Sequence, residues 1–303
     1  MEAVVTDHPQ GEFRRRAADR AMHWILRIIA SLTVVLLIGI FVFLLKSGLR
    51  TFSEVPILNF LFGTRWNPSS FHEPLWGILP LVTGTLFVSA GALLIAVPFG
   101  LSIAIYLSYI ASRRTREILK PVIEMIAGIP SVVLGLIGLL YLAPLIAKTF
   151  GLSNGLNALN ASILVAIATL PTIASLCEDA LSGLSHRLSE SSWALGATRW
   201  TTIRKVLVPA AAPGIGAAIM LGLGRAIGET MVVLMVAGNS LAFPRSFLEP
   251  VRPMTATIAI EIREVVVGDL HWNSLFAVGL VLFLITFAIN SVTDLYLHRT
   301  IRS

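Results

Sequence analysis

Residues 190–209 read ESSWALGATRWTTIRKVLVP, and they lie between two long apolar segments of the chain. Around this stretch, apolar residues recur at roughly helical spacing, at Leu181, Leu184, Leu188, Trp193, Leu195 and Ile203. Gly196 interrupts the pattern, and a glycine there lets the chain turn between two short helices. Ser189 is expected to cap the helix that follows it. We expect a compact helical hairpin at a membrane face, which either packs on its own bundle or contacts another protein.

The composition is that of an integral membrane protein. The 303 residues are 55% hydrophobic and 13% charged, whereas about a quarter of the residues of a soluble domain are charged. Crossing a hydrocarbon core of ~30 Å takes about 20 apolar residues in a helix. We therefore expect an all-α polytopic membrane protein with six transmembrane helices, at Trp24–Leu45, Ile78–Ile110, Pro121–Ala147, Ala158–Cys177, Pro213–Ala237 and Trp272–Leu297. No small-residue cleavage pattern follows the first span, so we expect it to be retained.

The basic residues predict the orientation of these spans. Most of the 23 Lys and Arg residues lie in the N-terminal tail 1–23, the loop after the second span, the loop 178–209 and the C-terminal tail 298–303. By the positive-inside rule both termini are cytoplasmic, the loop 46–77 is external and the loop 178–209 is cytoplasmic. The remaining spans divide the chain into the first span, 24–45, and a membrane core at 78–297. The sequence pI of about 10 then follows from topology, so no nucleic-acid partner is expected.

The opening stretch also resembles the EAA motif of binding-protein-dependent ABC importer permeases. That motif is Glu-Ala-Ala, three residues, Gly, nine residues and Ile-x-Leu-Pro. Here Glu190-Ser191-Ser192 is followed at the same intervals by Gly196 and Val206-Leu207-Val208-Pro209. Ser-Ser replaces the usual Ala-Ala, a change between small residues that still permits close packing. In that family the motif forms coupling helices that sit in a groove of the ATPase. The resemblance therefore implies ATPase coupling for Glu190, Ser191, Ser192, Gly196 and Pro209.

Further segments resemble the phosphate-specific permeases of the PstC type. They are LKPVIEMIAGIPSVVLGLIGL at 119–139, PTIASLCEDAL at 171–181, LGRAIGETMVVLMVAGN at 223–239 and TATIAIEI at 255–262. The resemblance implies a MetI-like permease core that imports inorganic phosphate by alternating access, in the cytoplasmic membrane of a prokaryote. It also implies a homologous PstA-type permease subunit, two cytoplasmic ATPase subunits and an external phosphate-binding protein as partners. The sequence has no G-x-x-x-x-G-K-[ST], so ATP would be used by the partner ATPases, and no cofactor or enzymatic site is expected in this chain.

Two formal charges interrupt the predicted fifth span. Arg225 and Glu229 occur in GRAIGETMVV, residues 224–233, and a central Arg costs at least about 2.5 kcal/mol on insertion scales. Because they are four residues apart, we expect both on one helix face and within reach of each other. One interpretation is a buried ion pair that only locks helix packing. The other places both residues on the substrate path, where the Arg fork suits phosphate and the carboxylate competes for it.

Weaker candidates lie in the third span and in the last external loop. The run Gly128-Ile129-Pro130-Ser131 can break a helix and expose backbone N–H groups to an anion, or it can simply form a kink that shapes packing. Glu124, just before it, faces either the lumen or the interface. The charges of the loop 238–271 contact the binding protein or are solvated, namely Glu261, Arg263, Glu264 and Asp269.

Other classes of function have less support. An intramembrane enzyme would need a G-x-S-x-G or a pair of membrane aspartates, which the sequence lacks, and an Arg–Glu pair is a poor acid–base set. Cys177 is the only cysteine, so there is neither a disulfide framework nor a cysteine metal site, and no metal site is expected. A permease for sulfate or molybdate stays open from composition, as does a non-transporting scaffold or sensor subunit.

Overall fold

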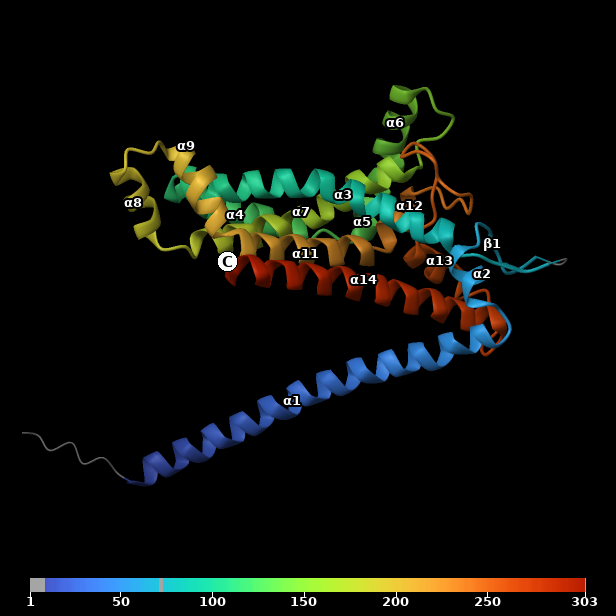
Figure 1. The fold of residues 1–303 in the computed structure, drawn as a ribbon, viewed down its shortest axis with the longest axis horizontal. Coiled ribbons are helices and arrows are strands. Elements are labelled where there is room, and N and C mark those ends of the chain that lie inside the picture. Colours follow the sequence, from blue (N-terminus) through green and yellow to red (C-terminus); the bar gives the residue numbers. More distant parts are fainter. Residues whose placement is uncertain (1–8, 71–72, 303) are drawn as a thin grey trace, which may run out of the picture.

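The computed structural model describes residues 9–70 and 73–302, which form a helical bundle (Figure 1). Within these residues, five helical segments are long and apolar enough to cross a membrane: Met22–Ser53, Leu79–Ile110, Ser131–Phe150, Ala158–Ser182 and Leu270–Val292. A sixth span arises if the bent pair Arg199–Ala210 and Ala212–Gly228 is counted as one. The all-α polytopic prediction is confirmed, and two of the six predicted boundaries need correction.

The centre of the bundle is α3 (Leu79–Ile105) packed along α7 (Ala158–Ser182), with α11 (Ala212–Gly228) against both. Glycines set these close approaches. A Cβ on Gly91 would lie 2.4 Å from Ser162 Oγ, and one on Gly222 would lie 2.6 Å from Ile173 Cγ1. Small residues at helix crossings are typical of membrane bundles, because van der Waals packing replaces the hydrophobic effect there.

The first helix, α1 (Pro9–Leu49), contains the predicted first span and meets α14 (Leu270–Arg302) only near one end. Gly48 packs against Ala277 there, and aromatic pairs such as Phe43–Trp272 add to the contact between the two helices. Every side chain from 22 to 40 is exposed, and α1 diverges from α14 toward the other end of the bundle (Figure 1). Such an apolar exposed helix suits a lipid environment.

The predicted third span, Pro121–Ala147, is wrong at its start. Residues 113–127 form a separate amphipathic helix, α4 (Arg113–Ala127), and the membrane-length segment begins at Ser131. It consists of α5 (Ser131–Ile137), the π-helical turn η3 (Gly138–Leu142) and α6 (Ala143–Phe150). Gly128 and Pro130 cause the break, because proline has no N–H to donate and disfavours helical backbone in the preceding Ile129.

The predicted fifth span, Pro213–Ala237, is also divided. α11 ends at Gly228, and the short helix α12 (Met231–Val236) follows after an extended Glu229. At its other end α11 follows α10 (Val208–Ala210) across a bend of 70°. The predicted sixth span, Trp272–Leu297, lies within α14.

One end of the bundle has a small second core, which we call the sheet end. It contains η1 (Arg50–Ser53), α2 (Ile57–Phe62), the strands β1 (Trp66–Asn67) and β2 (Leu75–Trp76), and α13 (Met254–Glu261). The strands are antiparallel with Trp66 opposite Trp76. Phe60, Trp66, Ile78, Met254 and Leu275 are fully buried between these elements and the start of α14.

Buried Glu261 holds this sheet end together. Its carboxylate accepts hydrogen bonds from Trp66 Nε1 at 3.1 Å and Arg252 Nη1 at 2.9 Å, and it contacts His271 Nε2 at 2.9 Å. The expectation that Glu261 is solvated or offered to a binding protein is therefore wrong, because the side chain is buried in internal contacts. Arg263, Glu264 and Asp269 are exposed.

Candidate functional site

The site is built on the break between α11 and α12. Glu229 has φ −66° and ψ 125°, so its backbone is extended and α11 ends at the preceding Gly228. Thr255 Oγ1, from α13, donates to the Glu229 carbonyl at 2.9 Å, and the Glu229 Oε1 accepts from the N–H of Val232 at 3.3 Å. These bonds satisfy backbone groups that the break would otherwise leave unpaired inside a membrane.

Arg225 lies in the last turn of α11, and its side chain is exposed. Its Nη1 donates to Thr172 Oγ1 of α7 at 2.9 Å. The predicted contact between Arg225 and Glu229 is absent, because α11 ends at Gly228 and the two residues no longer share a helix face. Instead, Arg225 lies at the C-terminal end of one helix and Glu229 beside the N-terminal end of another, where the helix dipoles stabilise each charge.

The second predicted break, at 128–131, leads to the same part of the bundle. Pro130 is the N-cap of α5, and α5 packs against α12. A Cβ on Gly135 would lie 2.6 Å from Met235 Sδ, so the two short helices touch at a glycine. Both helices that follow a break therefore face each other. Glu124 is separate from them, because it lines a pocket with Arg116 and Lys120 on α4.

The opposite end of the bundle has the predicted hairpin. Its helices are α8 (His186–Ala194) and α9 (Arg199–Thr202), and Gly196 between them has φ +81°. A buried hydrogen bond of 2.9 Å joins Ser192 Oγ to Thr202 Oγ1 across the turn. The glycine turn is confirmed. The cap is corrected, since Ser185 caps α8 and Ser189 lies inside the helix, bonded to the His186 carbonyl.

The hairpin presents apolar side chains to the outside. Trp193 and Trp200 are about half exposed or more, at 49% and 61%, and Leu195 is 89% exposed. Glu190 and Ser191 are exposed beside them, while Pro209 is at the start of α10, and the π-helical turn η4 (Ile203–Leu207) connects α9 to it. Clustered apolar side chains at the end of a bundle are typical of a protein–protein contact, which favours the docking interpretation over internal packing.

The comparisons with known proteins agree with this arrangement. Residues 96–302 match the family model described as the binding-protein-dependent transport system inner membrane component. The chain belongs to this family. It is therefore a multi-pass component of the cytoplasmic membrane, in a transport system that depends on a binding protein.

Individual relatives of this membrane component cover most of its length. The "Phosphate transport system permease protein PstC" of Mesorhizobium japonicum is 36% identical over 93% of this chain and 90% of its own. The "Probable ABC transporter permease protein YqgH" of Bacillus subtilis is 40% identical over 82% of this chain and 81% of its own. A solved structure of the MetNI methionine ABC transporter, in an inward-facing conformation, covers 74% of this chain and 94% of its own at 20% identity, with a TM-score of 0.55. This likeness confirms the MetI-like fold.

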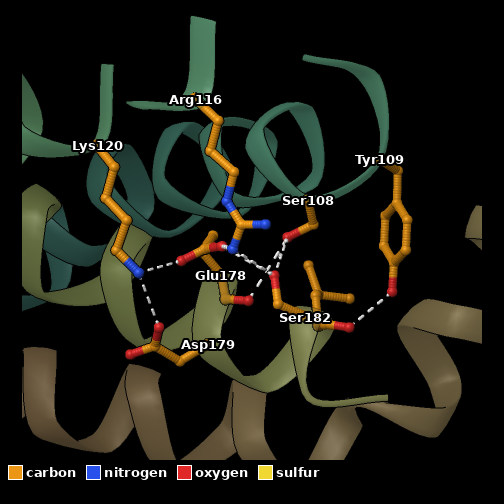
Figure 2. A network of polar contacts seen from close by, with 8 residues as sticks. Ser108, Tyr109, Arg116, Lys120, Glu178, Asp179 and Ser182 are labelled. Atoms are coloured by element: carbon orange, nitrogen blue, oxygen red, sulfur yellow. Dashed lines mark hydrogen bonds and ion pairs between the residues drawn. The ribbon is translucent and has the colours of Figure 1, made fainter. Parts of the chain in front are cut away.

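One polar network of this membrane component was missed by the sequence analysis. Glu178, near the end of α7, has a side chain only 1% exposed. Arg116 and Lys120, both from α4, form ion pairs with it, the latter at 2.6 Å, and Ser182 Oγ donates to it at 2.8 Å (Figure 2). The hydrogen bond to Glu178 is the main reason that the pKa of Lys120 lies above its usual value. The available signal was the acidic pair in PTIASLCEDAL, but its partners lie 58 and 62 residues earlier.

Proposed function

We propose that this chain is the PstC-type permease subunit of an ATP-driven importer of inorganic phosphate. The observation that carries the proposal is the 36% identity to a phosphate transport permease over nearly the whole chain. The exposed Arg225 at a helix break supports the cargo, because a guanidinium fork matches the oxygens of phosphate.

Arg225 would contact the transported phosphate, together with the Thr172 hydroxyl. Its bond to neutral Thr172 is one that a dianion would replace at little cost. Glu229, which follows the end of α11, would oppose tight binding, since a nearby carboxylate lowers the affinity of the site for an anion. Gly128, Pro130 and Ser131 would line the same path, because α5 after them packs on α12 after Glu229. Glu124 lies in α4 ahead of this break, and we propose for it at most a place at the mouth of the path.

The energy would come from partners. The complex would contain two cytoplasmic ATPase subunits. The hairpin of α8 and α9 would dock into one of them through Trp193, Leu195 and Trp200. The residues that shape this contact would be Glu190, Ser191, Ser192, Gly196 and Pro209. ATP would be bound and hydrolysed there, with no cofactor or enzymatic site in this chain. A homologous PstA-type subunit would complete the pore, and an external phosphate-binding protein would dock on the sheet end. Both termini would then be cytoplasmic.

Uptake of radiolabelled phosphate tests the cargo. Cells that depend on this subunit are compared with cells that lack it, at equal abundance of the partner subunits. Subunit-dependent uptake that resists an excess of sulfate and of molybdate is expected. An assembled complex that imports sulfate or molybdate instead would assign the permease to that oxyanion, and an assembled complex that imports none of them would favour a scaffold or sensor role.

A further inference from the structure

The Glu178 network joins two parts of the chain that the proposed mechanism needs to move together. Glu178 lies four residues before the end of α7, and only residues 183–185 separate that end from α8. On the other side, α4 leads directly through Gly128 and Pro130 into α5. We call the contacts of Glu178 with Arg116, Lys120 and Ser182 the Glu178 clamp.

The amphipathic helix α4 has no buried residue of its own in the part of the chain that the structure describes. Its position against α7 therefore rests on polar contacts, since none of its apolar side chains is buried. Two of those contacts converge on one carboxylate, Arg116 and Lys120 on Glu178, and Ser182 fills a further acceptor site (Figure 2). A buried carboxylate with two cations and a hydroxyl is fully satisfied, so this junction resists local slippage.

The rest of α4 is less firmly attached. Glu117 pairs with Arg113 within the helix, and both side chains are largely exposed, at 63% and 93%. Lys120 also reaches Asp179 at 3.0 Å, but that carboxylate is 60% exposed and, among the described residues, pairs with this one cation. Screening by water makes such exposed pairs weak. Among the described residues, buried Glu178 is therefore the firmest polar attachment of α4 to α7.

We propose that Glu178 is a positioning residue for coupling, which transmits movement of the α8–α9 hairpin through α4 to the break at Gly128–Ser131 and so to α5. The proposal rests on the proposed function, because it assumes that the hairpin is driven by an ATPase. It assigns to Glu178 no contact with phosphate and none with the ATPase. Loss of its charge should separate ATP hydrolysis from transport without abolishing either partner interaction.

The test uses the whole complex in proteoliposomes with its binding protein, and measures labelled phosphate imported and ATP hydrolysed in the same samples. Glu178→Gln keeps the size of the side chain and an acceptor for Ser182 but removes the charge. We expect normal assembly, binding-protein-stimulated hydrolysis, and a ratio of phosphate to ATP lower by about threefold or more. Glu117→Gln, the same substitution on the exposed face of α4, should leave the ratio unchanged.

A second variant keeps the proposal testable if Glu178→Gln fails to assemble. Lys120 is partly exposed, so Lys120→Gln is tolerated more easily, and its ratio should fall in the same direction. Where both single variants assemble, the double variant should lose little more than Glu178→Gln alone, because the two substitutions break one interaction. A structural role would lower abundance or melting temperature and leave the ratio at the wild-type value.

The ratio of phosphate imported to ATP hydrolysed in these variants decides between the proposal and its alternatives. A wild-type ratio in assembled Glu178→Gln, or in Lys120→Gln if only that variant assembles, would overturn the proposal. An equal fall in Glu117→Gln would also overturn it, because the loss of any carboxylate in or beside α4 would then have the same effect. Absence of phosphate import by the wild-type complex would reject the proposed cargo instead, and the ratio would then be measured with the oxyanion that is imported.

Discussion

Of the places in this bundle that combine acidic and basic residues, two are arranged in opposite ways. At the Glu178 clamp, one fully buried carboxylate holds Arg116 and Lys120. At the α11–α12 break, Arg225 and Glu229 are only four residues apart in the sequence and yet form no ion pair with each other. The first site has its charges paired, and at the second, within the described residues, the exposed guanidinium is bonded only to a threonine hydroxyl.

This difference separates a structural link from a site for a passing anion. Two cations that are already paired with a buried carboxylate are a poor site for a passing anion, and breaking such a buried pair costs about 3–5 kcal/mol. A guanidinium held by a neutral hydroxyl can exchange that bond for one to phosphate at small cost. The clamp is thus suited to transmit force, and the break is suited to bind and release a substrate.

The largest effect is expected at Arg225. Arg225→Gln removes the charge and the fork, and should reduce the initial rate of phosphate uptake by about tenfold or more, since charge-assisted bonds are worth about 1.5–3 kcal/mol. Arg225→Lys keeps the charge and should retain part of the rate. Uptake is measured per assembled complex. Equal rates in Arg225→Gln and wild type would move this residue to a packing role and remove the contrast with the clamp.

A smaller effect, of several fold, is expected at the hairpin turn. A β-branched side chain at φ +81° is strained by about 1–2 kcal/mol, whereas asparagine tolerates this conformation. A Cβ at Gly196 would meet no atom within 4 Å, so space is not the obstacle. We expect Gly196→Val to lower ATP-driven uptake and Gly196→Asn to keep most of it. If the two variants are indistinguishable, the left-handed turn is not needed for coupling.

Glu229→Gln should have a modest effect, about threefold, with a characteristic pattern. Glutamine can still accept from the Val232 N–H, so the start of α12 is preserved and only the charge is lost. If the carboxylate limits anion affinity, the variant should show a lower apparent KM and a lower maximal rate of uptake. Dose–response curves for phosphate distinguish this from a rise in KM, which would mean that Glu229 has no such competing role.

The smallest effect on transport is expected at Glu261, which is buried like Glu178 but lies at the sheet end. Glu261→Gln weakens the contacts to Arg252 and His271, so the purified subunit should melt at a temperature several degrees lower. Uptake per assembled complex should be unchanged, unlike the ratio in Glu178→Gln. The exposed Glu264→Gln serves as control and should not shift the melting temperature. Impaired transport in Glu261→Gln complexes would show that a buried carboxylate anywhere in the bundle affects coupling.

Much of this arrangement was predictable from the sequence. Apolar runs give the spans, and the spacing from Glu190 through Gly196 to Pro209 gives the hairpin, because a glycine turn is a local property of the chain. Pro130 also marked a break, yet the apolar residues from Pro121 onward were wrongly joined to the third span. That error arose because α4 is apolar along one side only, as an amphipathic helix is.

The candidate site was predictable in its residues and not in its geometry. Nothing between Gly228 and Met231 is a strong helix breaker, so Arg225 and Glu229 were placed on one helix face. The end of α11 is instead fixed by tertiary contacts, such as that of Thr255 with the Glu229 carbonyl. The Glu178 clamp was missed for the same reason, since its partners on α4 come from a distant segment and a single sequence does not show which segments pack together.

The central claim is that Arg225 offers its charge to the substrate, and chemical rescue tests it most directly. Cys177 is the only cysteine and is buried, so Arg225→Cys in a Cys177→Ala background provides one accessible thiol. The account predicts that phosphate uptake is lost in this variant, returns in part after 2-aminoethyl methanethiosulfonate adds a positive charge, and does not return after neutral methyl methanethiosulfonate. Uptake equal to that of the Cys177→Ala parent before any reagent, or equal recovery with both reagents, would contradict it.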